Sequence, residues 1–222
     1  MPASPADPAG GRSAENPETH RERRFDLSRA TAFSDGVFTI AATLLVLSID
    51  VPHLSNADAG QLGHELAEQT DQYVSYAISF AVIGLLWFRH HRFFHELGEV
   101  NAKMLALNLG YLSFVALVPF PTELIGQYSD QPIAVALYAA TISGVVIFAA
   151  AMWWYAGRAH LYKSESVEAG SRQSAIRILV SPAIMLASIP VAYLDTSVAK
   201  YMWLLLLVVR PTRLPGLAKA TT

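Results

Sequence analysis

The sequence lacks cysteine altogether and has few charged residues for its length. Without a thiol, the 222-residue chain can form no disulfide, iron–sulfur cluster or thiolate zinc site, and it has no cysteine nucleophile. Charged residues make up only 15% of the chain and apolar residues 53%, which is apolar-rich for a soluble domain. The longest basic cluster is the short one at Arg21, Arg23 and Arg24, and the net charge is −2. This balance argues against nucleic-acid binding.

Sequence signatures of enzymes and metal sites are also missing. The chain contains no nucleophile elbow, metalloprotease helix, phosphate-binding P-loop or dinucleotide fingerprint, so we expect no enzymatic activity and no cofactor. His91 and His95 have the i, i+4 spacing of a metal-binding pair. No carboxylate or further histidine is specifically placed to complete such a site, so we expect no metal centre here.

What the sequence does contain is a series of long runs free of Asp, Glu, Lys and Arg. A helix needs about 20 residues to cross a hydrocarbon core of roughly 30 Å, and most of the runs reach this length with their flanks. We therefore predict an all-α integral membrane protein. Its expected six transmembrane helices lie at about 29–51, 71–92, 102–122, 132–157, 175–194 and 197–210.

The distribution of basic residues predicts the orientation in the membrane. Of the 16 Lys and Arg residues, only Lys200 falls outside the terminal segments and the loops that share their side, and the alternate loops are acidic. We therefore expect a multi-pass protein of the cell (plasma) membrane with both termini cytoplasmic. Residues 1–25 should form a disordered cytoplasmic tail, 26–210 the membrane domain and 211–222 a second cytoplasmic tail.

Asp35 lies inside the first expected span and needs an explanation. An ionisable side chain at the centre of a membrane helix costs about 2.5–3.5 kcal/mol on insertion scales, so it requires a partner or water. Arg29 precedes it by six residues and points about 120 degrees away, which is poor for a direct pair. Polar side chains at a similar depth in the next two helices, including His90, His91 and Asn108, favour an interhelical connection. A second interpretation is that Asp35 binds a transported cation or relays protons with one of these histidines.

A different face of the same helix carries a regular stripe. Gly36, Ile40, Thr43, Leu44 and Leu47 follow the spacing of one helical face, away from Asp35. Periodicity alone favours ordinary core packing for this stripe.

The motif around Asp35 suggests a family. Arg29, three further residues, Phe33-Ser34-Asp35 and Gly36 form an ungapped string that opens the first helix. It resembles the opening of the endosomal/lysosomal potassium channel family, transmembrane protein 175, in its prokaryotic branch. The similarity extends to the Trp87–Phe94 stretch with its paired histidines, and from Asn108 through Pro119-Phe120-Pro121-Thr122.

The resemblance implies a homotetramer of six-helix subunits in which the first helices line a central cation pore. Ile40 matches the family's hydrophobic constriction and Thr43 a layer that is implicated in potassium preference, while Leu44 and Leu47 match further pore-lining positions. It also implies an interhelical polar network and a set of packing positions. The network comprises Arg29, Ser34, Asp35, His90 or His91, and Asn108, and the packing positions are Phe33, Gly36 and Trp87.

The function expected from the resemblance is a potassium-permeable, modestly potassium-selective cation channel in the lipid bilayer. The string Thr-Val-Gly-Tyr-Gly is absent, so no carbonyl filter of the usual kind supplies selectivity. Selectivity should arise along the first helix, at Ile40 and Thr43. The alternative is a proton- or cation-coupled secondary transporter that uses Asp35 with His90 or His91 as titrating groups.

Overall fold

The computed structural model describes residues 17–52 and 59–203, which form helices joined by short connections. An isolated β-bridge between Leu97 and Tyr162 ties two of these connections together. The helices are α1 (Pro17–Leu44) with the 3₁₀ turn η1 (Leu45–Ser48), α2 (Ala59–Glu68), α3 (Thr70–Glu96), α4 (Ala102–Leu117), α5 (Pro119–Gln127), α6 (Pro132–Arg158), α7 (Glu165–Ile178), α8 (Val180–Ala192) and α9 (Thr196–Met202).

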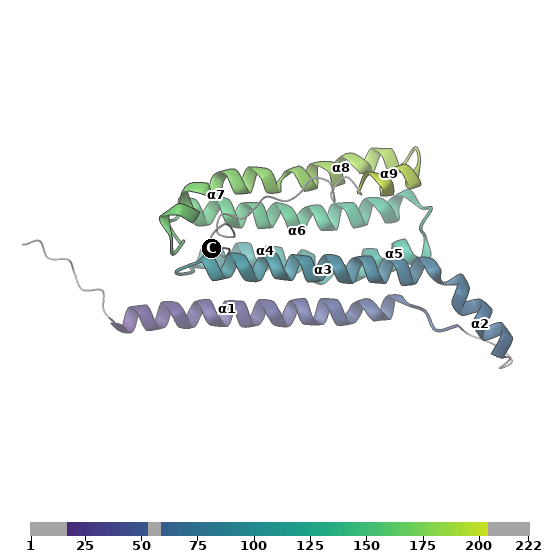
Figure 1. Cartoon of the computed structure of the whole chain (residues 1–222), viewed down its shortest axis with the longest axis horizontal. Coiled ribbons are helices and arrows are strands. Elements are labelled where there is room, and N and C mark those ends of the chain that lie inside the picture. The colour runs from purple at the N-terminus through teal and green to yellow at the C-terminus, as the bar shows by residue number, and fades with distance from the viewer. Residues whose placement is uncertain (1–16, 53–58, 204–222) are drawn as a thin grey trace, which may run out of the picture.

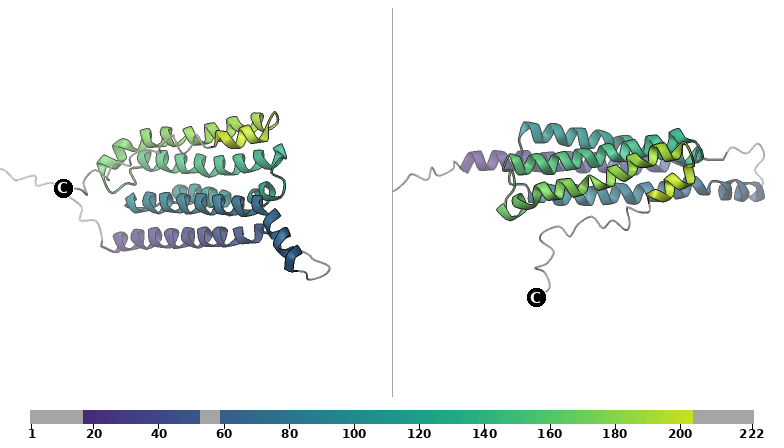
Figure 2. Two further views of the ribbon diagram at one scale, coloured as in Figure 1. Left: turned by 45° about the vertical axis from the view of Figure 1, so that its right-hand side comes forward. Right: turned by 90° about the horizontal axis from the view of Figure 1, so that it is seen from above.

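The long helices run side by side as a layered bundle (Figures 1 and 2). Helix α1 lies at one edge, where it contacts α3 and α4. Helix α6 lies on the side of α3 and α4 that is away from α1, and it packs against α4 on one side and against α7 and α8 on the other (Figure 1). The short helix α2 projects from the end of the bundle at which α1 finishes (Figure 1). Among the described helices, one side of α1 is therefore left without a neighbour.

Five helical stretches of the described residues are long and apolar enough to cross a membrane. They are Leu27–Ser48, Thr70–Glu96, Ala102–Gln127, Pro132–Arg158 and Gln173–Ala192. The protein is thus an all-helical membrane protein, as its apolar runs predict. The sixth expected span, 197–210, coincides with α9 only at its start, and from residue 204 it lies outside the described residues.

The beginning of α1 differs from the expected boundary between a disordered tail and the membrane domain at residue 26. The helix starts at Pro17, and its membrane-spanning part starts at Leu27. Proline is favoured in the first turn of a helix, because its missing N–H would have no partner there. The Glu and Arg residues that follow it are good helix formers. Residues 1–16 and 211–222, which we expected to belong to tails, lie outside the described residues.

Prolines divide two of the spans, as their lack of a backbone donor predicts. Helix α4 ends at Leu117 and α5 begins at Pro119. Likewise, α7 ends at Ile178 and α8 begins at Val180, with Pro182 in its first turn. A proline cannot donate to the carbonyl four residues earlier, so Pro182 leaves the carbonyl of Ile178 without its helical partner. Pro190, by contrast, lies within α8.

Two glycine–phenylalanine contacts set the close approach of α4 and α6. The ring of Phe148 on α6 lies over Gly110 on α4, and the ring of Phe114 on α4 lies over Gly144 on α6. A Cβ atom built on Gly110 would lie 2.2 Å from the Phe148 ring, and one on Gly144 would lie 2.4 Å from the Phe114 ring. The two rings also contact each other, with centroids 5.7 Å apart. Each helix thus places a phenylalanine over a glycine of the other, and these contacts fix both the separation and the axial register of the two helices.

Candidate functional site at the first helix

A chain of buried polar side chains connects α1, α4 and α3. Ser34 on α1 accepts a hydrogen bond from the Asn108 amide on α4 at 3.0 Å, and the Asn108 carbonyl oxygen lies 2.8 Å from Nε2 of His90 on α3. The Ser34 hydroxyl itself donates to the backbone carbonyl of Ala30 at 2.8 Å. All three side chains are at most 5% exposed. These hydrogen bonds therefore fix the rotation of α1 about its axis and its axial position relative to α3 and α4.

Asp35 forms a separate connection to α3. Its carboxylate accepts a hydrogen bond from the indole N–H of Trp87 at 2.8 Å. The neighbouring His91 is exposed and lies beside the Trp87 ring, with ring centroids 5.7 Å apart. Arg29 is exposed on α1, six residues before Asp35. The structure thus brings His90 to Asn108 and Trp87 to Asp35.

The two connections follow from which residues share a face of each helix. On α1, Ser34, Phe38, Ala41 and Leu45 recur at the spacing of one helical stripe, and all four are buried. Asp35 lies at the margin of this stripe and is half-buried, so its carboxylate reaches α3 along the side of the helix. The resulting charge-assisted hydrogen bond offsets part of the cost of placing a carboxylate in a membrane helix.

The opposite face of α1 has no packing partner among the described residues. Ile40 is 60% exposed and Leu47 is 70% exposed, and Leu44 and Thr43 are exposed beside them. Gly36 continues this face, and a Cβ atom built on it would meet nothing within 4 Å. Phe33, which we expected to pack, is 56% exposed near the beginning of the same segment. The sequence-predicted stripe therefore faces outward and does not pack in the core of the single subunit.

The hydroxyl of Thr43 has a defined orientation on that face. It donates to its own helix, with the carbonyl oxygens of Thr39 and Ile40 both 3.0 Å away. Because the hydroxyl proton points at the backbone, the lone pairs of the oxygen are directed away from it. An oxygen in this state can accept a hydrogen bond or coordinate a cation.

Two further polar groups join the helices toward the other end of α1. The Asp50 carboxylate accepts from the side-chain amides of Gln72 and Gln127, at 3.1 and 3.2 Å. Deeper in the bundle, Thr122 donates to Ser79 at 2.9 Å, and Ser79 lies 3.2 Å from the Tyr138 hydroxyl. Our sequence interpretation named none of these as site residues. The signal available was the presence of polar side chains such as Ser79 within apolar runs, but single hydroxyls there are common.

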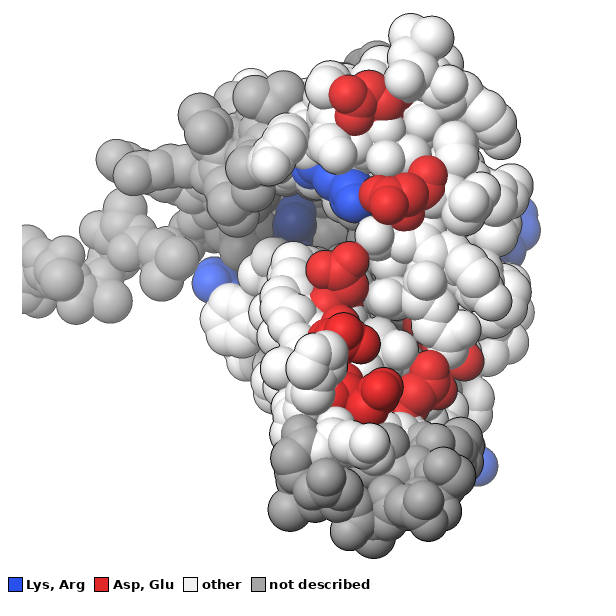
Figure 3. All heavy atoms as spheres, turned by 90° about the vertical axis from the view of Figure 1, so that its right-hand side faces the viewer, with Lys and Arg blue, Asp and Glu red and all other residues white. Residues whose placement is uncertain are grey.

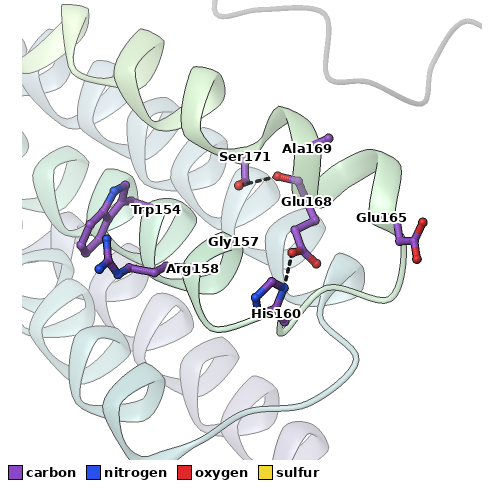
Figure 4. A pocket seen from close by; sticks show the side chains of 8 residues that line it. All are labelled: Trp154, Gly157, Arg158, His160, Glu165, Glu168, Ala169 and Ser171. Atoms are coloured by element: carbon purple, nitrogen blue, oxygen red, sulfur yellow. Dashed lines mark hydrogen bonds and ion pairs between the residues drawn. The ribbon is translucent and has the colours of Figure 1, made fainter.

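A hollow of about 740 Å³ lies at the junction of α6 and α7, at the end of the bundle where α1 begins (Figure 4). Two pairs among its lining side chains contact each other. His160, whose backbone has the left-handed φ of 55°, contacts the Glu168 carboxylate, and Arg158 stacks 5.4 Å from the centre of the Trp154 ring. Nearby, burial is the main cause that raises the pKa of Tyr162. None of the sequence-predicted site residues lines this hollow. Within 17–52 and 59–203, no group of three or more His, Asp and Glu could hold a metal ion.

Comparison with known proteins decides the family. The family model described as endosomal/lysosomal potassium channel TMEM175 matches residues 29–119, which contain α3, α4 and most of the membrane-spanning part of α1. A potassium channel of Streptomyces collinus is 37% identical over 154 residues, which cover 67% of this chain and 74% of that protein. The chain belongs to the TMEM175 family. The family is one of ion channels, so this member is not an enzyme.

Other TMEM175 relatives extend the comparison. A potassium channel of Chamaesiphon minutus is 35% identical over 60% of this chain and 68% of that protein. The endosomal/lysosomal proton channel TMEM175 of Bos taurus is 34% identical, and the matching region covers only 32% of its length. The chain therefore corresponds to about a third of the vertebrate protein.

Solved structures show the same fold. The crystal structure of a lysosomal potassium-selective channel TMEM175 homolog from Chamaesiphon minutus matches with a TM-score of 0.71 and 27% identity. That match covers 85% of this chain and 99% of the other. The potassium channel MtTMEM175, bound to a nanobody fusion, matches with a TM-score of 0.61 and 20% identity over 82% of this chain and 89% of the other. The helical arrangement in Figure 1 is thus the TMEM175 fold.

Proposed function

We propose that this TMEM175 family member is a potassium-permeable, modestly potassium-selective cation channel. In this proposal four subunits assemble with their α1 helices around a central pore, in the cell membrane. The observation that carries the proposal is the similarity to bacterial relatives that are named potassium channels, at 37% and 35% identity, together with the family model that matches residues 29–119. The exposed face of α1 gives this similarity a structural counterpart.

The outward stripe of α1 supports a role as pore lining. Lipid can cover exposed leucine and isoleucine, but it does not account for Gly36 and Thr43 on the same stripe. A glycine within a helix costs about 0.5–1 kcal/mol relative to alanine, and no atom of the described residues would exclude a Cβ at Gly36. A glycine here would leave space for a neighbouring subunit to approach α1 closely, or for the pore to be wider at this level.

Within the proposed pore, Ile40 and Thr43 have different roles: Ile40 forms the constriction and Thr43 coordinates the cation. Four Ile40 side chains meeting at the axis would form an apolar constriction that gates by excluding water, and Leu44 and Leu47 would extend it. Four Thr43 oxygens, each with its proton directed at its own helix, would replace part of a cation's hydration shell. Potassium releases its water more readily than sodium, so the preference is for potassium. A single hydroxyl layer offers few ligands, and selectivity is therefore modest.

The polar connections behind α1 would act as positioning elements for the pore. Ser34 and Asp35 lie on the side of α1 that faces α3 and α4, so the constriction is placed by contacts on the opposite side of the same helix. In this proposal the network comprises Ser34, Asn108 and His90, joined by the Asp35–Trp87 pair, with Arg29 at the beginning of the segment. Asp35 bonds to Trp87 and His90 bonds to Asn108, so the two do not bond to each other. This argues against a coupled transporter in which they exchange a proton directly.

The charge at the two ends of the bundle supports the orientation with both termini cytoplasmic. The end at which α1 finishes presents mainly Asp and Glu, and the red atoms in Figure 3 lie across that face. Acidic residues at this end include Asp50, Asp71, Glu123, Asp130 and Asp195. Fourfold repetition of this face would concentrate cations near the outer mouth.

The experiment that tests the proposal is a bi-ionic reversal potential, potassium against sodium, for the purified protein in a planar bilayer. Ile40→Asn should wet the constriction, raise cation flux several-fold and reduce the potassium preference. The matched control is Ile147→Asn, which alters an isoleucine of α6 that is 43% exposed and lies off the proposed pore. Flux that saturates at a low rate, or an Ile40→Asn protein that forms an intact oligomer with unchanged currents, would refute the pore assignment.

A specific comparison favours proton permeation as a second property. The Bos taurus relative is named a proton channel, whereas the Streptomyces collinus relative is named a potassium channel. Reversal potentials measured across a pH gradient at symmetrical potassium would separate the two, because only a proton-permeable pore shifts its reversal potential with pH.

A further inference from the structure

An exposed apolar strip on α6 leads into the hollow between α6 and α7. Ile133, Leu137, Ile147 and Trp154 are each at least 37% exposed. At the helical angle per residue they fall within about 100 degrees of one another around the axis of α6. Arg158, one turn after Trp154, continues the same side and is exposed at the end of the helix. Acyl chains of the membrane can therefore lie along this strip and reach the hollow.

The hollow lies at the depth at which two membrane spans end. The span of α6 finishes at Arg158, and the next span along the chain begins at Gln173. The residues that line the hollow fall between Trp154 and Ser171. Tryptophan is enriched at the level of the lipid headgroups, and arginine near a helix end extends its charge toward that level. A ligand in the hollow is thus beside the headgroups, with the apolar strip running into the membrane from it.

Contacts between α6 and α7 shape the hollow. The side chain of Ser171 lies against the backbone of α6 at Gly157, where a Cβ atom would overlap its hydroxyl. That hydroxyl donates to the backbone carbonyl of Glu168 at 2.7 Å. His160, with its left-handed φ of 55°, contacts the Glu168 carboxylate through Nδ1. These contacts form the hollow without a ligand, so its charged groups are already placed.

The hollow presents opposite charges from its two helices. Arg158 extends from α6 on one side, and the Glu168 carboxylate extends from α7 on the other (Figure 4). Within the described residues Arg158 forms no ion pair with an acidic side chain, and it lies over the Trp154 ring. Glu168 uses Oε1 for His160, which leaves Oε2 able to accept. Glu165, at the edge, points away from both (Figure 4).

This pair of charges selects the chemistry of a ligand. A phosphate alone would bind Arg158 but would be repelled by Glu168, and an amine alone would have the reverse difficulty. A phosphate diester that also carries a primary ammonium group satisfies both. Its phosphate oxygens can accept two hydrogen bonds from the guanidinium, and its ammonium N–H groups can donate to the carboxylate. Phosphatidylethanolamine has this headgroup, whereas phosphatidylcholine lacks the N–H donors and phosphatidylglycerol lacks the cation.

We propose that the hollow between α6 and α7 is a binding site for an aminophospholipid of the phosphatidylethanolamine type. The phosphate binds Arg158, the ammonium group binds Glu168, and an acyl chain lies along the strip from Trp154 to Ile147. The hollow, at about 740 Å³, is in the size range of ligand pockets. This inference does not rest on the proposed conductance.

Native mass spectrometry of the purified full chain in detergent tests the arginine. Phosphatidylethanolamine, phosphatidylcholine and phosphatidylglycerol with identical acyl chains are titrated in turn, and we expect the first to bind several-fold more tightly than the others. Arg158→Gln should weaken binding of both phosphatidylethanolamine and phosphatidylcholine several-fold. Arg92→Gln is the matched control, because Arg92 lies over the Phe88 ring of α3 in the same way, at 5.7 Å, but does not line the hollow.

The same titration tests the carboxylate. Glu168→Gln should lower the affinity for phosphatidylethanolamine to that for phosphatidylcholine, because only the former donates to this side chain. Glu165→Gln, the same change three residues earlier on α7, should keep the difference between the two lipids. The wild-type comparison of lipids needs no variant, so it stays informative if Glu168→Gln does not fold.

Four results would overturn the inference. Equal binding of the three lipids would mean unspecific contact, and a preference for phosphatidylglycerol would mean a simple anion site. Equal effects of Arg158→Gln and Arg92→Gln, or of Glu168→Gln and Glu165→Gln, would place the lipid elsewhere. Competition by glycerophosphoethanolamine, which has no acyl chains, as strong as that by the lipid would show a soluble ligand. Conductance of the same samples tests the channel proposal separately.

Discussion

At the scale of single residues, the membrane-embedded part of α1 divides its polar groups between two neighbours. Ser34 reaches α4 through Asn108, while Asp35, the next residue, reaches α3 through Trp87. Adjacent residues on a helix differ by about 100 degrees in direction, which is why one short motif can connect to two helices. The motif Phe33-Ser34-Asp35 thus connects α1 to both α3 and α4. An acidic residue in this position does not by itself indicate an ion site.

This division leads to a prediction for the Asp35–Trp87 hydrogen bond. Trp87→Phe removes the donor, and Asp35→Leu removes the acceptor, so we expect either to lower stability by about 1–2 kcal/mol, a fall in Tm of a few degrees. Asp35→Asn keeps an amide oxygen that can still accept from the indole, so it removes only the charge and should cost less. Thermal unfolding of the detergent-solubilised oligomer measures this. Because Trp87→Phe and Asp35→Leu remove the same bond, the double variant should lose little more than either single one. Fully additive losses, or a stable Asp35→Asn oligomer with altered ion selectivity, would contradict the positioning role.

At the scale of secondary-structure elements, the reciprocal contacts between α4 and α6 determine how closely the two halves of the bundle approach. Gly110 and Gly144 each leave room for a phenylalanine of the other helix, so the pair works in both directions. Small residues allow close approach in membrane helices generally, and here the space they leave is filled by rings instead of backbone. The packing joins α1, α3 and α4 to the helices that follow α6.

The glycine contacts predict a loss of stability on adding a single methyl group. Gly110→Ala places a Cβ where the Phe148 ring lies, and displacing that ring should cost roughly 1–3 kcal/mol. Gly63→Ala in α2 is the control, because nothing lies within 4 Å of a Cβ there, and it should be neutral or slightly stabilising. Thermal unfolding compares the two. Phe148→Leu in the Gly110→Ala background should restore part of the loss, and no difference between the glycine variants would show that the ring moves freely.

At the scale of the whole molecule, the described residues separate charge between the two ends of the bundle. Arg29, Arg89, Arg92, Lys103 and Arg158 lie toward the end where α1 enters its span, while acidic residues dominate the opposite face in Figure 3. Such asymmetry orients membrane proteins with the basic end toward the cytoplasm. The same charge asymmetry would favour cation conduction, since an acidic outer mouth attracts the cations that the proposed pore conducts.

The orientation can be checked by site-specific labelling. Single cysteines introduced into this cysteine-free chain have no competing thiols. A cysteine at Ser129, in the connection between α5 and α6, should react with an impermeant maleimide added to intact cells. A cysteine at Ser164, between α6 and α7, should react only after the membrane is permeabilised. The reverse pattern would invert the topology, and cross-linking of the purified protein up to a fourfold mass would support the tetramer.

Some features of the structure follow from local sequence alone. Helical spans can be predicted because a membrane requires apolar length, and α4 and α7 end near Pro119 and Pro182 because a proline cannot donate its backbone hydrogen bond. The need of Asp35 for a partner is likewise a property of one residue in its span. The family resemblance of the string from Arg29 to Gly36 is confirmed by the comparisons.

The partners, by contrast, were decided by the tertiary structure. Asn108 bonds to His90 and not to the adjacent His91, and Asp35 bonds to Trp87 instead of a histidine, because these choices depend on how far α3 is rotated about its axis. A rotation by one residue would exchange His90 and His91. Hydropathy and periodicity define which residues lie in the membrane and on which face, but helix rotation and axial register arise only from packing between helices, as at Gly110 and Phe148. The sequence by itself determined the spans and the apolar stripe, and only the packed bundle decided that the stripe containing Ile40 faces outward.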